Sequence, residues 1–281
     1  MQLKQIRGLK ISKMKLIDFH THIYPEKIAE KAVKSVADFY SIEAKSGGTA
    51  EDLLAQAQVA GVQRCVILPV AINPVGVRHI NEFTAEQARL HPEFIPFGTL
   101  HAGSAGLLDE AQQILDLGLY GVKMHPDTQL FNIDDERLYP VYDMLQGRLP
   151  FIFHSGDPRY DYSHPRRIKK ILHDFPQLVC IAAHFGGWRM QDEAYELLHG
   201  EENCYYDISS SLSYLPREKA IGFIRGYGAE KFLFGSDFPV GLPSIEKENL
   251  LSFKLTDNET DQIAYKNACN IINLAKTGKK K

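Results

Sequence analysis

The feature that most constrains the fold is an alternation of strand-like and helix-like segments along the whole chain. Eight short apolar segments have the composition of buried β-strands, at residues 15–22, 64–72, 94–102, 121–126, 150–156, 178–187, 204–210 and 231–239. Each is followed by a stretch with apolar positions at helical spacing. Strands separated by helices pair in parallel through right-handed crossovers. Eight such units in roughly 250 residues predict an α/β fold, a single closed (β/α)8 TIM barrel.

The main alternative is an open, doubly wound sheet. Such sheets usually carry a Gly-rich phosphate turn after the first strand, whereas here the first strand leads into "HTHIYP". No linker or break in composition divides the chain, so we expect one barrel domain over residues 14–281 and an N-terminal extension over residues 1–13. The segment 24–63 is longer than one crossover requires, and we expect it to fold over the barrel mouth.

Composition narrows the class of protein further. The hydrophobic share of 44% is ample for a core, and a net charge of −3 argues against a nucleic-acid partner. No apolar stretch approaches the roughly 20 residues of a membrane span, and the N-terminus lacks the apolar middle of a secretory signal. We therefore expect a cytoplasmic protein without a membrane partner.

The cysteines form no CxxC pair and are expected to be buried, reduced thiols: Cys65, Cys180, Cys204 and Cys269.

The first strand ends in an unusual motif, "LIDFHTH". Alternate side chains of a strand point the same way, so Asp18, His20 and His22 are expected to share one face. Polar groups that face an interior are costly unless something there pairs with them. A metal ion or a catalytic site is the usual partner.

Further polar residues fall at the ends of other predicted strands. In a (β/α)8 barrel the reacting groups lie at the carboxyl ends of the strands. The residues placed there are His20, His22, His101, Lys123, His125, His154, His184 and Asp237. His79, His91, His173 and His199 fall in helical segments and are expected at the surface, and His164 follows the fifth strand in a loop.

Metal geometry explains the paired histidines. Residues i and i+2 of a strand lie about 6.6 Å apart and point the same way, so two imidazoles can converge on one ion. His154 and Asp237 from across the barrel would complete a set of three nitrogens and one carboxylate. This set suits one divalent transition metal, with zinc expected and iron, cobalt or manganese as substitutes. Lys123 and His125 are expected to line the pocket.

The motifs "DFHTH", "GVKMHP", "FHSG", "AHFGG" and "FGSDFP", in this order, resemble those of the amidohydrolase superfamily. The chain is most similar to its amidohydrolase-related branch, which contains metal-dependent hydrolases and non-oxidative decarboxylases. The resemblance implies that His20, His22 and His154 bind the metal, with Asp237 as a further ligand or as the base beside the bound water. Barrels of this kind often pair, which is compatible with a homodimer.

The resemblance implies roles for three more residues. His184 would bind a second metal or polarise water and substrate. Asp18 would be an additional ligand or a carboxylate that orients a histidine. Lys123 stands on the fourth strand, where members with two metals carry a carboxylated lysine. We expect a single metal and a charged, unmodified Lys123 that faces an anionic small-molecule substrate.

Two reactions are compatible with this site. In hydrolysis, the first hypothesis, Asp237 accepts a proton from a metal-activated water that attacks an ester, lactone or amide carbonyl, and His184 stabilises the oxyanion. In the alternative, decarboxylation of an aromatic or unsaturated acid, Asp237 or His184 delivers a proton to carbon. Carboxylate recognition then needs a cation, for which Lys123, Arg159 and Arg189 are candidates. A third hypothesis is a non-catalytic metal-binding barrel with a closed ligand shell.

Overall fold

A computed structural model describes residues 14–278 of the chain and confirms the predicted barrel. The extension expected at residues 1–13 lies outside the described residues, as do residues 279–281. The strands are β1 (Ile17–Thr21), β2 (Arg64–Ile67), β3 (Phe94–Pro96), β4 (Gly98–Thr99), β5 (Val122–Met124), β6 (Phe151–Phe153), β7 (Cys180–Ala182), β8 (Cys204–Asp207) and β9 (Phe232–Leu233).

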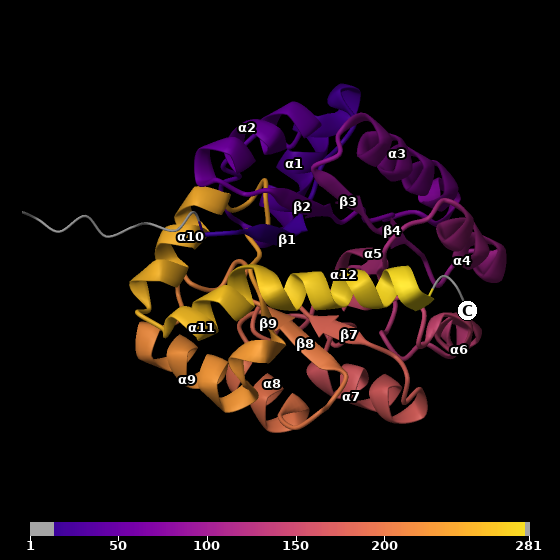
Figure 1. Cartoon of the computed structure of the whole chain (residues 1–281). Helices are drawn as coiled ribbons and strands as arrows, with labels where there is room; N and C mark the ends of the chain where they lie inside the picture. Colours follow the sequence, from indigo (N-terminus) through magenta and orange to yellow (C-terminus); the bar gives the residue numbers. More distant parts are fainter. Residues whose placement is uncertain (1–13, 279–281) are drawn as a thin grey trace, which may run out of the picture.

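All neighbouring strands pair in parallel, and the sheet closes on itself. β3 and β4 are two halves of one strand interrupted at Phe97, whose N–H still bonds to Ile67 O at 3.1 Å. Between the first and last strands, Phe19 N–H donates to Phe234 O at 2.8 Å, and Thr21 bridges to Phe238. The eight strand segments expected from sequence therefore form one closed barrel (Figure 1).

Helices surround the strands (Figure 1). The longer ones are α1 (Glu26–Tyr40), α2 (Ala50–Ala60), α3 (Val77–Leu90), α4 (Leu107–Asp116), α6 (Tyr139–Leu145), α7 (Pro165–Asp174), α8 (Gln191–Leu198), α9 (Arg217–Tyr227), α10 (Pro243–Ser252) and α12 (Asn267–Gly278). Shorter pieces are α5 (Pro126–Gln129), α11 (Asp257–Asp261), the 3-10 helices η1 (Pro74–Gly76), η2 (Glu136–Leu138) and η3 (Ala229–Lys231), and the π-helix η4 (Gln262–Lys266). No helix within residues 14–278 is long and apolar enough to cross a membrane.

Alternation along the strands divides the core into two layers. Phe151 and Phe153 of β6 belong to the apolar cluster beneath the helices, whereas Ile152 between them packs with Ile181 and the α12 residue Ile271. This second cluster also contains residues at the starts of strands, so α12 covers the end of the barrel at which the strands begin (Figure 1). The opposite end is left for the polar residues.

The segment after β1 crosses that opposite end, as expected. α1 begins after Pro25, and α2 begins with a capping box in which Thr49 and Asp52 satisfy each other's backbone N–H groups. Lys45 N–H bonds to Pro239 O beside the last strand at 2.8 Å, and the Tyr40 hydroxyl lies 2.6 Å from His125 Nε2. The end of α1 therefore lies over the histidines at the barrel mouth.

Candidate active site

Three residues from the two ends of the chain converge at the barrel mouth. His20 Nε2 and His22 Nε2 lie 3.4 Å and 3.3 Å from Asp237 Oδ1. β1 supplies His20, and the loop after β9 supplies Asp237 because β9 closes the barrel against β1. Two ligands of one tetrahedral zinc ion at 2.0–2.2 Å would lie about 3.3–3.5 Å apart, so these spacings fit one shared ion.

The hydrogen bonds of the two histidines orient their rings so that Nε2 faces Asp237, and on His20 this nitrogen also contacts Lys123 Nζ at 3.2 Å. His20 Nδ1 donates to Asp207 Oδ2 at 2.8 Å, and His22 Nδ1 donates to Leu68 O at 2.6 Å. Neither acceptor carries a hydrogen, so each ring holds a hydrogen on Nδ1, and a ring in its neutral form then has its lone pair on Nε2. Burial, then the charge of Lys123, lowers the pKa of His20 to about 4, which keeps its ring neutral at pH 7.

These donors fit a divalent cation. The Asp237 carboxylate presents Oδ1 to the Nε2 atoms of His20 and His22, while Ser210 Oγ donates to its Oδ2. Two imidazole lone pairs and one carboxylate oxygen attract a cation. Lys123 Nζ, 3.2 Å from His20 Nε2, is one such cation, and a divalent ion among the three ligand atoms would be another. His20, His22 and Asp237 could therefore hold a metal ion.

Lys123 is a cation directly beside this group. It lies in β5 in register with Ile152 of β6, its side chain is buried, and its Nζ lies 3.2 Å from His20 Nε2. Burial lowers the pKa of Lys123 to about 8, against the opposing charges of Asp237 and Asp207. No carboxylate within residues 14–278 forms a salt bridge with it. Its charge is therefore available to an anion.

Asp207 at the end of β8 was not anticipated from the sequence. Its Oδ2 holds His20 Nδ1, while its Oδ1 accepts the backbone N–H of His184 at 3.1 Å and the hydroxyl of Ser209 at 2.5 Å. His20, His184 and Asp207 form a second group of donors, but these hydrogen bonds already occupy the carboxylate. Asp207 is the "D" of "CYYDISS" and ends a predicted strand. The rule that polar residues at strand ends face the site would therefore have identified it as a candidate.

Asp18 contacts the backbone of the site and not a ring. Its Oδ1 accepts the N–H groups of His20 at 3.2 Å and Ser236 at 3.0 Å, and its Oδ2 has no hydrogen-bond partner. The pairing of β1 with β2 shifts register between Asp18 and Thr21, so the simple alternation expected for "DFHTH" is interrupted. Asp207, in place of Asp18, orients the His20 ring.

His154 lies on the other side of the mouth, between His184 and His125. Its Nδ1 is 3.0 Å from His184 Nε2, and its ring stacks on that of His125 with centroids 4.1 Å apart. The group of ligand atoms around Asp237 contains His20 and His22 but not His154, which is instead grouped with Asp127 and Asp157. The structure thus places the first-strand histidines and Asp237 together, with His184 linking them to His154.

Two site residues have an unusual backbone. His184 and Asp237 have φ angles of 62° and 58°, in the left-handed region that non-glycine residues rarely adopt. Ser210 Oγ donates to Asp237 Oδ2 and directs the other oxygen towards the histidines. Strained residues of this kind gather at functional sites, where surrounding contacts hold them.

The two arginines proposed for substrate binding differ in placement. Arg159 makes a bidentate pair with Asp157, with Nε–Oδ1 at 2.9 Å and a second contact at 2.7 Å, and it stacks on aromatic rings. Arg189 is exposed and stacks on Trp188 and Tyr214. The structure does not bring either guanidinium into contact with the histidine group.

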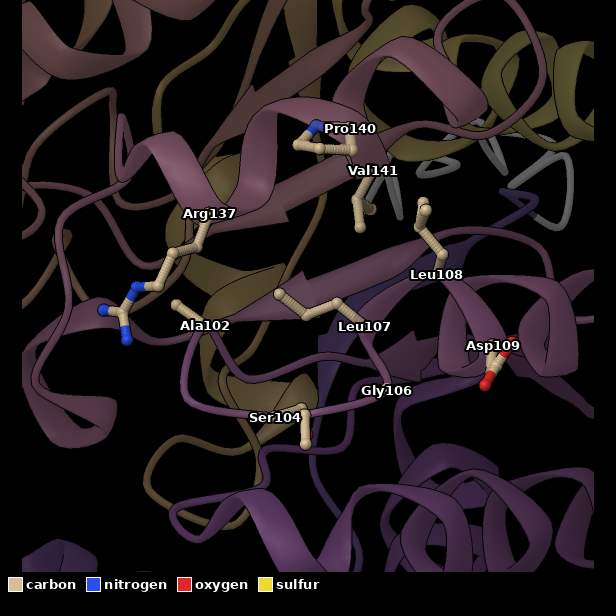
Figure 2. A pocket seen from close by; sticks show the side chains of 10 residues that line it. Ala102, Ser104, Gly106, Leu107, Leu108, Asp109, Arg137, Pro140 and Val141 are labelled. Atoms are coloured by element: carbon tan, nitrogen blue, oxygen red, sulfur yellow. The ribbon is translucent and has the colours of Figure 1, made fainter.

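His101 also lies apart from the group. Its Nδ1 accepts the N–H of Gly103 at 2.9 Å, and its ring packs on Phe131. Beyond it, the loop after β4, the start of α4 and the η2–α6 segment line an open pocket of about 400 Å³ (Figure 2). None of the site histidines lines that pocket, whose lining includes Leu107, Arg137 and Val141.

Comparisons with known proteins identify the family of the chain and solved structures that share its fold. A family model described as Amidohydrolase matches residues 17–274, and no curated protein matches the sequence. Among solved structures, an uncharacterized TIM-barrel protein from Bordetella bronchiseptica is 23% identical with a TM-score of 0.79, covering 93% of this chain and 99% of that one.

Two decarboxylases share the fold at lower identity. The 5-carboxyvanillate decarboxylase of Sphingomonas paucimobilis is 15% identical with a TM-score of 0.69, covering 92% of this chain and 99% of that one. A dihydroxybenzoic acid decarboxylase from Polaromonas, solved with manganese and the inhibitor 2-nitroresorcinol, is 15% identical with a TM-score of 0.66, covering 92% and 97%.

Proposed function

Because the chain belongs to the amidohydrolase family, we propose that it is a metal-dependent enzyme that decarboxylates a small aromatic or unsaturated carboxylic acid. The observation that carries the proposal is Lys123, a buried cation 3.2 Å from the metal-facing nitrogen of His20 and without a carboxylate partner in the described chain. Two decarboxylases of aromatic acids share this fold, and they support an aromatic carboxylic acid as the substrate class.

In this proposal His20, His22 and Asp237 hold one divalent ion. When bound, the ion supplies a Lewis acid that neutralises charge on the substrate's oxygens. Manganese in a related decarboxylase favours manganese beside zinc as the ion to test. His154 can join the ligand set only after one of its ring nitrogens, now engaged by His184 and Tyr40, is released.

The chain's own residues would do the rest. Lys123 binds and orients the substrate carboxylate. As the carbon–carbon bond breaks and carbon dioxide leaves, the electron pair stays on the substrate carbon. Asp237 or His184, after taking up a proton from solvent, then delivers it to that carbon, so the net reaction consumes one proton, releases carbon dioxide and consumes no water.

Hydrolysis of an ester, lactone or amide is the second candidate. Asp237 favours it, since one of its oxygens faces the two histidine Nε2 atoms while Ser210 holds the other. A carboxylate in that position can accept a proton from a water molecule and return it to a leaving group.

The experiment is a product assay on purified protein loaded with Mn²⁺ or Zn²⁺. Hydroxybenzoates and 5-carboxyvanillate are tested for trapped carbon dioxide, and lactones and amides for ¹⁸O incorporation from water. We expect about one metal per chain, carbon dioxide release, loss of both in His20→Ala, and loss of activity with metal retained in Lys123→Met. Incorporation of ¹⁸O without carbon dioxide would overturn decarboxylation in favour of hydrolysis. Bound metal without any turnover would support the non-catalytic barrel.

A further inference from the structure

Tyr40, at the last position of α1, reaches the histidines from outside the barrel. Its hydroxyl lies 2.6 Å from His125 Nε2 and 3.3 Å from His154 Nε2. Nothing in the sequence around it, "ADFYSIE", indicates a site residue. Tyr40 nevertheless joins α1 to the mouth, beside Phe39, whose ring lies 6.3 Å from that of His125.

The partners of this contact fix the direction of every hydrogen bond. Thr128 N–H donates to His125 Nδ1 at 3.4 Å, so the hydrogen of this neutral ring is on Nε2 and is donated to the Tyr40 oxygen. Tyr40 O–H is then free to donate to His154 Nε2. The single Tyr40 hydroxyl can therefore accept from one ring and donate to the other, which places one hydrogen in each of its two contacts.

The same chain continues to His184 and ends at a carbonyl. With Nε2 accepting from Tyr40, His154 donates through Nδ1 to His184 Nε2 at 3.0 Å. His184 Nδ1 in turn donates to Ser209 O at 3.2 Å. At the His184 end, Ser209 Oγ is a second acceptor 3.0 Å from Nδ1, because its own hydrogen is donated to Asp207. At the other end Thr128 N–H is shared between His125 Nδ1 and His125 O, and both ends agree with this direction. Tyr40 is the only hydrogen-bonding link between His125 and His154 that the described residues provide.

Arg159 holds Tyr40 in this position. One guanidinium nitrogen donates to Phe39 O at the end of α1 at 2.7 Å, while the other contacts form the bidentate pair with buried Asp157. The guanidinium also lies 5.4 Å from the Tyr40 ring and 5.7 Å from the Trp188 ring. Arg159, expected from sequence as a substrate-binding residue, therefore ties α1 to the loop after β6.

We propose that Tyr40 is a positioning residue of the active site, which fixes the tautomers of His125, His154 and His184, and that Arg159 is the latch that keeps it there. This inference deepens and rests on the proposed function, because it decides which nitrogen of His184 can take up the proton that the reaction delivers to carbon. It also implies that a substrate reaches the site past the end of α1.

The first test reads the tautomers directly. ¹⁵N-histidine spectra of the metal-loaded protein, assigned with His125→Gln and His154→Gln, distinguish ring nitrogens with and without hydrogen. We expect Tyr40→Phe to shift the ring nitrogens of His125 and His154 towards a mixture of tautomers. The matched control is Tyr160→Phe, which removes a hydroxyl from the same aromatic cluster but away from these rings. Unchanged ring signals in a folded Tyr40→Phe protein would overturn the positioning role.

The second test asks whether Arg159 holds α1 over the site, by measuring how accessible His125 is to a chemical reagent. Diethyl pyrocarbonate modification is mapped by mass spectrometry, with exposed His79 as the internal reference. We expect Arg159→Ala to raise the His125 rate about tenfold or more, as loss of one charge-assisted hydrogen bond would. Quenching of Trp188, the only tryptophan, by acrylamide should rise in parallel. The control, Arg189→Ala, removes a guanidinium from the same indole but should leave His125 at the wild-type rate.

Arg159→Lys guards against misfolding of the alanine variant, because lysine retains a charge for Asp157 but cannot also reach Phe39 in the same fork geometry. It should raise the His125 rate by a smaller factor. Wild-type rates in both folded Arg159 variants would overturn the latch. None of these measurements requires turnover. They therefore test the roles of Tyr40 and Arg159 even if the decarboxylation assay fails.

Discussion

At the residue scale, the ligand geometry depends on a partner far away in sequence. His20 and Asp207 are separated by 187 positions, yet their 2.8 Å hydrogen bond decides which nitrogen of His20 faces Asp237. Burial alone would raise the pKa of Asp207, but the hydrogen bonds that it accepts from His20 Nδ1 and the Ser209 hydroxyl help to hold it well below its usual value. Asp207 is therefore ionised and fixes the ring.

We expect Asp207→Asn to weaken metal binding about 10–100-fold, because the amide is a poorer acceptor and His20 can then present either nitrogen. Competition with a metal-chelating dye measures the change. Asp174→Asn is the control, since Asp174 lies on the exposed face of α7 and pairs with Lys170. Equal affinities for wild type and Asp207→Asn would contradict this account of the ring's orientation.

At the element scale, the loops after β6 and β7 bring His154 and His184 together through backbone contact. Ser155 Oγ donates to Gly186 O, and Trp188 N–H donates to Ser155 O, both at 2.6 Å. A Cβ on Gly156, whose φ is +70°, would lie 2.7 Å from Gly187 Cα. The glycines of "FHSG" and "AHFGG" thus permit the close approach of the two loops.

Gly156→Ala should lower the free energy of unfolding by roughly 2–4 kcal/mol, through both the positive φ and the clash with the neighbouring loop. Gly200→Ala separates the two causes: its φ is +88°, but nothing lies within 4 Å of the added carbon. That control should cost only about 1–2 kcal/mol. Urea denaturation measures both, and equal losses would mean that the loop contact contributes nothing.

At the scale of the whole molecule, the barrel buries acidic groups whose protonation couples stability to pH. Burial, with added repulsion from Asp18 and Asp237, raises the pKa of Glu246 on α10 to about 8. The folded chain therefore binds a proton that the unfolded chain has released between about pH 4.5 and pH 8. Stability should consequently fall as the pH rises through this range.

We expect Glu246→Gln to be more stable than wild type by roughly 2–4 kcal/mol at pH 8 and nearly equal at pH 5. Glutamine keeps an oxygen for Asn249, which donates to Glu246 Oε2. Denaturant unfolding at the two pH values gives the difference, with exposed Glu248→Gln on the same helix as control. A stability gain that is the same at both pH values would rule out the protonation of Glu246 as its cause.

The sequence by itself determined the barrel, because strand and helix periodicities are local patterns and eight repeats leave little choice of topology. It also placed His20, His22 and Asp237 at the same end, since parallel strands all end on one side. Only the tertiary structure decided which nitrogens face one another, that Asp207 orients His20, and that Tyr40 and Arg159 close the mouth. These orientations and contacts join segments that are distant in sequence. A shift of one ångström or a change of one rotamer decides which atoms form a hydrogen bond, and local sequence patterns do not contain that information.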